Sequence, residues 1–218
     1  MATGETQRRQ DLEFMNVQPG RPGLRLDLPR GARLRVSPKM FWRLCCANRD
    51  LRLERTATGR LIVMAPAGAE SGGRNADLIV DLGIWARADG TGKVFDSSAG
   101  FTLPNGAVRA PDVAWIRLDR WRAVPAEARK RFASICPDFV AELRSPSDSL
   151  AEVRRKMVEY IDQGAHLGWL IDPIRGAVEV YRPRREAEVL ERPATLSGED
   201  VLPGFVLELR GILGDEPA

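Results

Sequence analysis

Two short stretches, RAPDVAWI (residues 109–116) and FVAELRSPS (residues 139–147), decide how this chain is expected to fold. Both are mostly apolar and strand-like, and each carries a carboxylate, Asp112 in the first and Glu142 in the second. A helical segment that carries Lys156 and Tyr160 follows them. Charged side chains are normally kept out of such positions because removing a charge from water costs free energy. Three charges that converge in one place therefore predict a functional site.

The helical segment carries its lysine inside the apolar face that must pack on a sheet. The spacing i, i+3, i+4, i+7 and i+8 defines that face and is typical of one side of a helix. Its members are Val153, Lys156, Met157, Tyr160 and Ile161. Only four of the 33 basic residues are lysines, so a lysine at a special position carries information.

The rest of the chain alternates between helix and strand patterns. Residues 1–15 predict a flexible tail, and residues 16–37, rich in Pro, Gly and Arg, predict an extended arm with one or two short strands. Ser37 and Pro38 predict a helix start, and a second helix is expected from about Ser71 or Asn75 to Ala88. Further helices are expected at 126–132 and 145–163, and strands at 51–55, 61–64, 94–95, 101–103, 113–116, 138–143, 169–171 and 178–181, with short strands after 184.

This order predicts an α/β or α+β fold, in which one mixed sheet is flanked by helices. Residues 16–218 are expected to form a single domain with extra strands at its N- and C-terminal ends.

Composition excludes several classes of function. No apolar run approaches the roughly 20 residues of a membrane helix, and residues 1–10 do not resemble a secretory signal, so a cytoplasmic location is expected. The three cysteines lack a CxxC pair, which argues against zinc and disulfides and predicts buried thiols. A single histidine, no GxSxG near a base and no GxxxxGK[ST] give no support to serine hydrolase or P-loop chemistry.

Charge is unevenly distributed along the chain. The formal net charge is +3, but residues 1–60 hold 13 basic and 6 acidic residues, which leaves −4 for the remainder. A basic N-terminal third is compatible with a polyanionic partner, and a solvated basic arm is an equal alternative.

The carboxylates suit a divalent metal ion. Side chains alternate between the two faces of a strand, so neighbouring strands would bring Asp112 and Glu142 within reach of one ion. Carboxylates, waters and a backbone carbonyl are the hard oxygen ligands that Mg²⁺ or Mn²⁺ prefers. Lys156 could orient an attacking water and offset negative charge on a phosphate. The alternative is a buried ion pair between Lys156 and Glu142, with Asp112 capping a turn.

The sequence also resembles a known superfamily. Pro-Asp followed about 30 residues later by Glu-x-basic resembles the PD-(D/E)XK nucleases, and over roughly residues 38–210 the chain is similar to the Uma-two family of endonucleases. The matching segments are 53–55, 110–114, 142–148, 156–160, Gly164, 169–173 and 201–205.

The resemblance implies a restriction-endonuclease-like fold, a divalent metal (Mg²⁺ or Mn²⁺), hydrolysis of phosphodiester bonds in DNA, and a homodimer. Asp112 and Glu142 match the metal carboxylates. The usual lysine position is occupied by Arg144, which cannot readily release a proton. The Uma-two pattern places its lysine on the next helix, where Lys156 stands.

Four residues are possible accessory members of the predicted site. Glu70 is a candidate for the additional acid that some relatives use, and Glu54, which interrupts a strand, is its rival; Arg144 and Tyr160 complete the set. Two other functional classes remain open at this point. One is an inactive nuclease-like fold that binds nucleic acid or protein, and the other is a scaffold with buried ion pairs that does not bind Mn²⁺.

Overall fold

The structure, a computed structural model, describes residues 34–214. The predicted tail at 1–15 and the part of the predicted arm at 16–33 lie outside the described residues. The described end of the arm, residues 34–37, is held by an antiparallel bridge between Arg35 and Arg60. The Val36 N–H donates to the Gly59 carbonyl at 2.8 Å.

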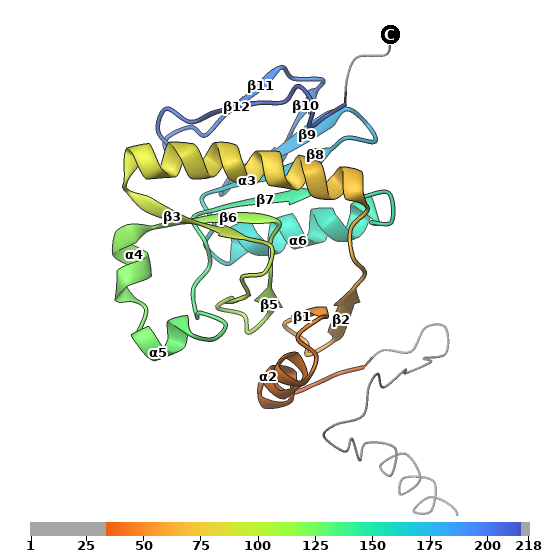
Figure 1. Ribbon diagram of the computed structural model, residues 1–218, viewed down its shortest axis with the longest axis vertical. Helices are drawn as coiled ribbons and strands as arrows, with labels where there is room; N and C mark the ends of the chain where they lie inside the picture. The colour runs from red at the N-terminus through yellow and green to blue at the C-terminus, as the bar shows by residue number, and fades with distance from the viewer. Residues whose placement is uncertain (1–33, 215–218) are drawn as a thin grey trace, which may run out of the picture. The chain divides into compact units, whose positions relative to one another are not determined.

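A six-stranded mixed sheet organises the fold, in the order β10-β9-β8-β7-β6-β3 (Figure 1). Its only parallel neighbours are β7 and β8, and every other adjacent pair in this sheet is antiparallel. The strands are β3 (Gly92–Asp96), β6 (Val113–Arg117), β7 (Phe139–Leu143), β8 (Leu167–Asp172), β9 (Ala177–Tyr181) and β10 (Glu188–Glu191).

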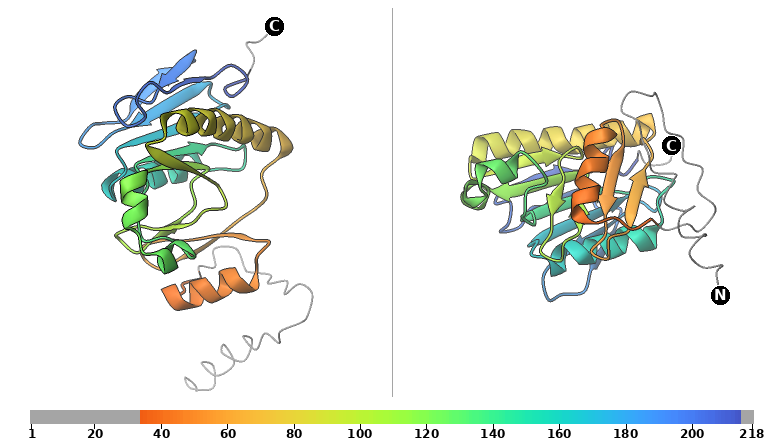
Figure 2. Two further views of the ribbon diagram at one scale, coloured as in Figure 1. Left: turned by 60° about the vertical axis from the view of Figure 1, so that its left-hand side comes forward. Right: turned by 90° about the horizontal axis from the view of Figure 1, so that it is seen from below.

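Helices cover both faces of this sheet, as the turned views in Figure 2 show. Helix α3 (Ala69–Asp89) packs Leu78 and Leu82 on the face that carries Val113 and Trp115. Helix α6 (Leu150–Asp162) packs on the opposite face. Its buried Met157 and Tyr160 meet Val140 and Leu170 there.

Two smaller sheets accompany the large one. The first has the order β2-β1-β5-β4 and consists of β1 (Arg52–Arg55), β2 (Leu61–Met64), β4 (Phe101–Thr102) and β5 (Val108–Arg109). The second pairs β11 (Thr195–Ser197) with β12 (Val206–Glu208), and Leu196 and Leu207 join the core under α3. The mixed sheet, its flanking helices and the hairpin of β1 and β2 were expected from the sequence, whereas the two-residue strand β5 was not.

Three further helices lie within residues 34–214: α2 (Pro38–Ala47), α4 (Leu118–Ala123) and α5 (Ala126–Arg129). The predicted cap of α2 is confirmed, since the Ser37 hydroxyl accepts from Met40 N–H at 3.2 Å. None of the helices in the described part of the chain is long and apolar enough to cross a membrane.

Three helix boundaries differ from expectation, one of them being the start of α6 at Leu150 instead of near residue 145. Helix α3 begins at Ala69, before the predicted Ser71, because the Glu70–Arg74 ion pair at 2.6 Å supports a first turn that contains two helix-weakening glycines. Helix α5 ends at Arg129, short of the expected Phe132.

Candidate functional site

Lys156 lies at the centre of the cluster formed by the predicted site residues. Its ammonium nitrogen is 2.8 Å from Oε1 of Glu142 and 2.8 Å from Oε1 of Glu54. The hydroxyl of Tyr160, one helical turn further along α6, donates to Oε1 of Glu142 at 3.1 Å. All four side chains are largely or wholly buried. Strand β1 of the four-stranded sheet, strand β7 of the six-stranded sheet and helix α6 thus meet at Lys156.

Asp112 is held beside this cluster by the pairing of β6 with β7. Val113 pairs with Ala141 in antiparallel register, so the next position brings Asp112 opposite Glu142 on the same face of the sheet. Oδ2 of Asp112 accepts from the Leu143 N–H at 2.9 Å, and Oδ1 lies 3.5 Å from the Arg52 guanidinium. The side chain keeps 21% of its surface exposed, so this edge of the cluster is reached by solvent.

Glu54 is held by three donors. Oε1 accepts from the Ala110 N–H at 3.0 Å as well as from Lys156, and Oε2 accepts from Arg109 at 2.9 Å. Burial opposes ionisation of Glu54, but Lys156 and Arg109 outweigh it and lower its pKa. A carboxylate with both oxygens so occupied is suited to fixing Lys156 in place.

Glu142 lies in a very different electrostatic environment. Burial, together with the negative charges of Asp112 and Glu54, raises its pKa to about 8 even though Lys156 acts in the opposite direction. For Lys156, burial opposes the charge, but Glu142 and Glu54 outweigh it and raise its pKa. The ammonium group therefore remains charged at neutral pH, while Glu142 lacks a full counter-charge.

The donor set fits a hard divalent cation. Oε1 of Glu142 takes both hydrogen bonds, which leaves its Oε2 without a donor among residues 34–214. The Oδ1 atom of Asp112 is likewise free of a close donor among these residues, because its contact with the Arg52 guanidinium is long at 3.5 Å. The described residues hold no cluster of three or more His, Cys, Asp or Glu placed to hold a metal ion. Two carboxylates completed by waters are a common arrangement for Mg²⁺.

Two of the accessory candidates lie elsewhere. Glu70 pairs with Arg74 in the first turn of α3, and its side chain is 80% exposed. Arg144 donates to Oδ2 of the buried Asp172 at 2.8 Å, and its Nε lies 3.4 Å from the Asp148 carbonyl. Of the two rival acids, the structure brings Glu54, and not Glu70, into contact with Lys156.

Sequence reasoning assigned no role to Arg109 or Glu159. Arg109 bridges the two acids, donating to Glu54 and, from Nε, to Oε2 of Glu159 at 2.6 Å. Asn105 donates to the other oxygen of Glu159 at 2.9 Å. A signal for Glu159 was present, since it follows Lys156 by three positions and so lies near it on the helix surface. The pairing of Arg109 depends on β5, a two-residue strand with no visible pattern.

This arrangement can be compared with known proteins. The family model Uma2, described as "Putative restriction endonuclease", matches residues 38–210. The chain belongs to the Uma2 family. Membership therefore places it among proteins described as nucleases of the restriction-endonuclease type, as the sequence resemblance indicated.

A solved structure supports the fold of this Uma2 member. It is a crystal structure from Anabaena variabilis ATCC 29413, described as "a putative nuclease belonging to DUF820". The two chains are 21% identical with a TM-score of 0.63, and the match covers 74% of this chain and 89% of the other. No curated protein sequence matches the chain.

Proposed function

We propose that this Uma2 protein is an endonuclease that hydrolyses phosphodiester bonds of DNA with the help of Mg²⁺ or Mn²⁺. The observation that carries the proposal is the position of Lys156, held between two carboxylates and next to a third that is open to solvent. Family membership supplies the reaction class.

In this proposal Asp112 and Glu142 hold the ion through the oxygens that lack strong donors. A divalent ion at this place would acidify a bound water and neutralise charge on the phosphate. Its charge would also favour the ionised form of Glu142, which burial and neighbouring acids disfavour.

Lys156 acts in this proposal as a charged hydrogen-bond donor. Because its pKa is raised, it does not serve as a base; it donates to the attacking water or to a phosphate oxygen as negative charge develops there. Glu54 and Tyr160 are positioning residues, the first for Lys156 and the second for Glu142. Hydrolysis adds water across the P–O bond, and the leaving oxygen takes up a proton.

Substitution at Lys156 tests the catalytic proposal. We expect Lys156→Arg to fold but to lose about 100-fold or more in metal-dependent nicking of supercoiled plasmid, because a planar guanidinium does not fit between two oxygens that each lie 2.8 Å from one nitrogen. Lys130→Arg, at an exposed lysine, is the matched control and should nick like wild type. Circular dichroism checks that both variants fold.

Metal binding separates this function from the two alternatives. Calorimetric titration with Mn²⁺ should give heat for wild type and much less for Asp112→Asn, whose side chain loses its charge. Wild type that neither binds Mn²⁺ nor nicks DNA would instead identify a scaffold with buried ion pairs. Wild type that binds DNA without cleaving it would identify an inactive nuclease-like module; the engagement of Arg144 with Asp172 is the observation that favours this alternative.

We also propose that the protein forms a homodimer. Strand β3 is an edge of the six-stranded sheet, and beside it runs a groove shared with α3. Val80 and Ile84 line this groove and are 55% and 62% exposed. Exposed apolar side chains next to an edge strand favour association with a second chain.

A further inference from the structure

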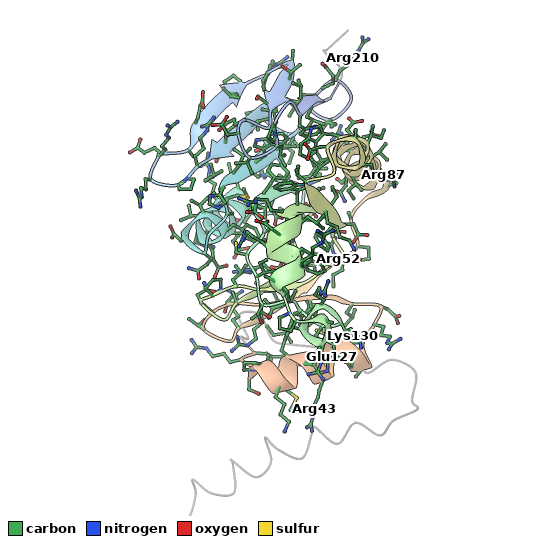
Figure 3. The ribbon with its side chains drawn as sticks, turned by 90° about the vertical axis from the view of Figure 1, so that its left-hand side faces the viewer. Arg43, Arg52, Arg87, Glu127, Lys130 and Arg210 are labelled. Atoms are coloured by element: carbon green, nitrogen blue, oxygen red, sulfur yellow. The ribbon has the colours of Figure 1, made fainter. Side chains whose placement is uncertain are left out.

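Five exposed cations lie in segments of the chain that contribute no residue to the carboxylate cluster. They come from α2, from β3, from the last residue of α5 and from the segment that follows it, and we call them the basic stripe. Its members are Lys39, Arg43, Lys93, Arg129 and Arg131. Figure 3 labels Arg43 on α2, Glu127 on α5 and Lys130 directly after α5.

Aromatic side chains join these segments into one surface. The ring of Phe132 lies 5.5 Å from that of Phe41 and 5.3 Å from that of Trp42, which fixes the segment after α5 against α2. The guanidinium of Arg131 lies over the Trp42 ring at 5.2 Å from its centroid. Residues from two distant parts of the sequence are therefore held side by side.

A second tryptophan extends the surface to β3. The guanidinium of Arg129 and the ammonium of Lys93 both lie 5.8 Å from the centroid of Trp121 on α4. Cations that rest on aromatic faces lose less freedom when they bind a ligand, because part of their conformational entropy is already lost. Three of the five members, Lys93, Arg129 and Arg131, are thus preorganised on aromatic rings.

The stripe has few counter-charges. Within residues 34–214, none of its five members forms an ion pair, in contrast to Arg109, which pairs with Glu54, and to the arginines that pair with the acids Asp172 on β8 and Glu179 on β9. Helix α2 contains no acidic residue. Two acids close to the stripe in sequence, Asp119 and Glu127, are already engaged by Arg117 and Lys130, and Asp89 and Asp96, which flank Lys93, accept from Thr91 and Ser98. The five charges are therefore available to a negatively charged partner.

We propose that the basic stripe binds the phosphate backbone of the nucleic acid on which this protein acts. Cations on a rigid aromatic base can contact successive phosphates without reading sequence, and such contacts position a protein on its substrate. The inference deepens the proposed function by giving the substrate a second contact surface, and it rests on that function only for the identity of the substrate.

Equilibrium binding without cleavage tests the stripe. The triple variant Lys39→Gln/Arg43→Gln/Arg131→Gln is compared with wild type by fluorescence anisotropy of a short labelled DNA duplex in the presence of a chelator. Each lost phosphate contact should reduce the slope of log affinity against log salt by about 0.9, so the slope should become shallower by about 2.7. Affinity at low salt should fall at least about tenfold.

The matched control removes the same number of charges elsewhere. Arg184→Gln/Arg185→Gln/Arg210→Gln changes three exposed arginines outside the stripe and should leave the salt slope close to that of wild type. Equal losses in both triple variants, or no loss in the stripe variant, would overturn the proposal. The single variant Arg43→Gln, at an exposed position on α2, should change the slope by about 0.9 and serves if the triple variant does not fold.

Two further measurements separate this inference from the catalytic proposal. Hydrolysis of the small diester bis(p-nitrophenyl) phosphate with Mn²⁺ should be the same for wild type and the stripe variant, because this substrate is too small to need the stripe. If wild type cleaves neither DNA nor the small diester, the catalytic proposal is rejected. If the stripe variant then still binds DNA more weakly than wild type, the proposal for the stripe is supported. Displacement of the duplex by poly-glutamate at equal charge would show an acidic protein partner and overturn the nucleic-acid assignment.

Discussion

At the residue scale, Glu142 differs from Glu54 in how far its charge is compensated by neighbouring groups. Lys156 is shared between two acids, and Glu54 also receives Arg109 and the Ala110 N–H, so Glu54 is fully compensated. Glu142 is not, and its pKa rises to about 8. A buried acid with this imbalance gains from any cation that reaches its free oxygen.

This imbalance predicts a specific dependence of stability on pH. Because the folded state raises the pKa of Glu142 from 4.5 to about 8, its stabilising contribution is complete below pH 4.5 and is lost as pH rises towards 8. Relative to Glu142→Gln, metal-free wild type should lose up to roughly 4–5 kcal/mol in free energy of unfolding between these values. Urea denaturation at a series of pH values in chelator measures this difference.

Adding Mg²⁺ supplies the internal control for the pH experiment. The ion should flatten the wild-type curve between pH 5 and 8 and leave that of Glu142→Gln nearly unchanged, since the amide is a weaker ligand. Parallel curves for the two proteins without metal would contradict the pKa shift.

At the element scale, helix α6 is attached to the sheet by two ion pairs and by apolar packing. Glu142, Leu170 and Glu179 form one row across β7, β8 and β9. Lys156 forms an ion pair with Glu142. The Nε–H of Arg154 donates to both carboxylate oxygens of Glu179, each at 3.0 Å. Met157 and Tyr160 fill the apolar part of the contact. The helix position, and with it the lysine, is therefore fixed by two separate acids.

The close approach of β3 to the core gives a prediction about two glycines. A Cβ at Gly92 would lie 2.1 Å from Cε2 of the buried Trp115, so Gly92→Ala should destabilise the fold by about 1–3 kcal/mol or more. At Gly83 in α3 a Cβ would meet nothing within 4 Å, so Gly83→Ala should stabilise the helix by about 0.5–1 kcal/mol. Thermal melts of the two variants should shift in opposite directions; a shift in the same direction would contradict this packing.

Much of this arrangement could be predicted from the sequence. Ser37 with Pro38, the turn at Gly59 and the apolar face of α6 are local signals, and the elements they predict are present. The position of Asp112 opposite Glu142 follows from strand alternation once β6 and β7 pair. The contacts of Arg109 and Arg144 could not be predicted, because they depend on which strands become neighbours and not on any local pattern.

At the scale of the whole molecule, the proposed homodimer can be measured directly. Size-exclusion chromatography with light scattering should give wild type twice the 24.2 kDa of one chain. Ile84→Lys adds a charge to the groove beside β3 and should shift the protein towards monomer, because burying that ammonium on association is costly. Val206→Lys, at a residue 54% exposed on β12, is the control and should remain dimeric. A wild-type mass of one chain would reject the dimer.

The position of Glu54 on β1 of the four-stranded sheet has a consequence for folding during synthesis on the ribosome. Its partner Arg109 lies 55 positions later in the chain, and Lys156 follows later still on α6. At roughly 5–20 residues per second, the hairpin of β1 and β2 is synthesised seconds before the cations that neutralise its acid. An unpaired carboxylate resists burial, so the hairpin should stay hydrated until α6 is available. The lysine that defines the site would thus also set the moment in synthesis at which the N-terminal hairpin can dock.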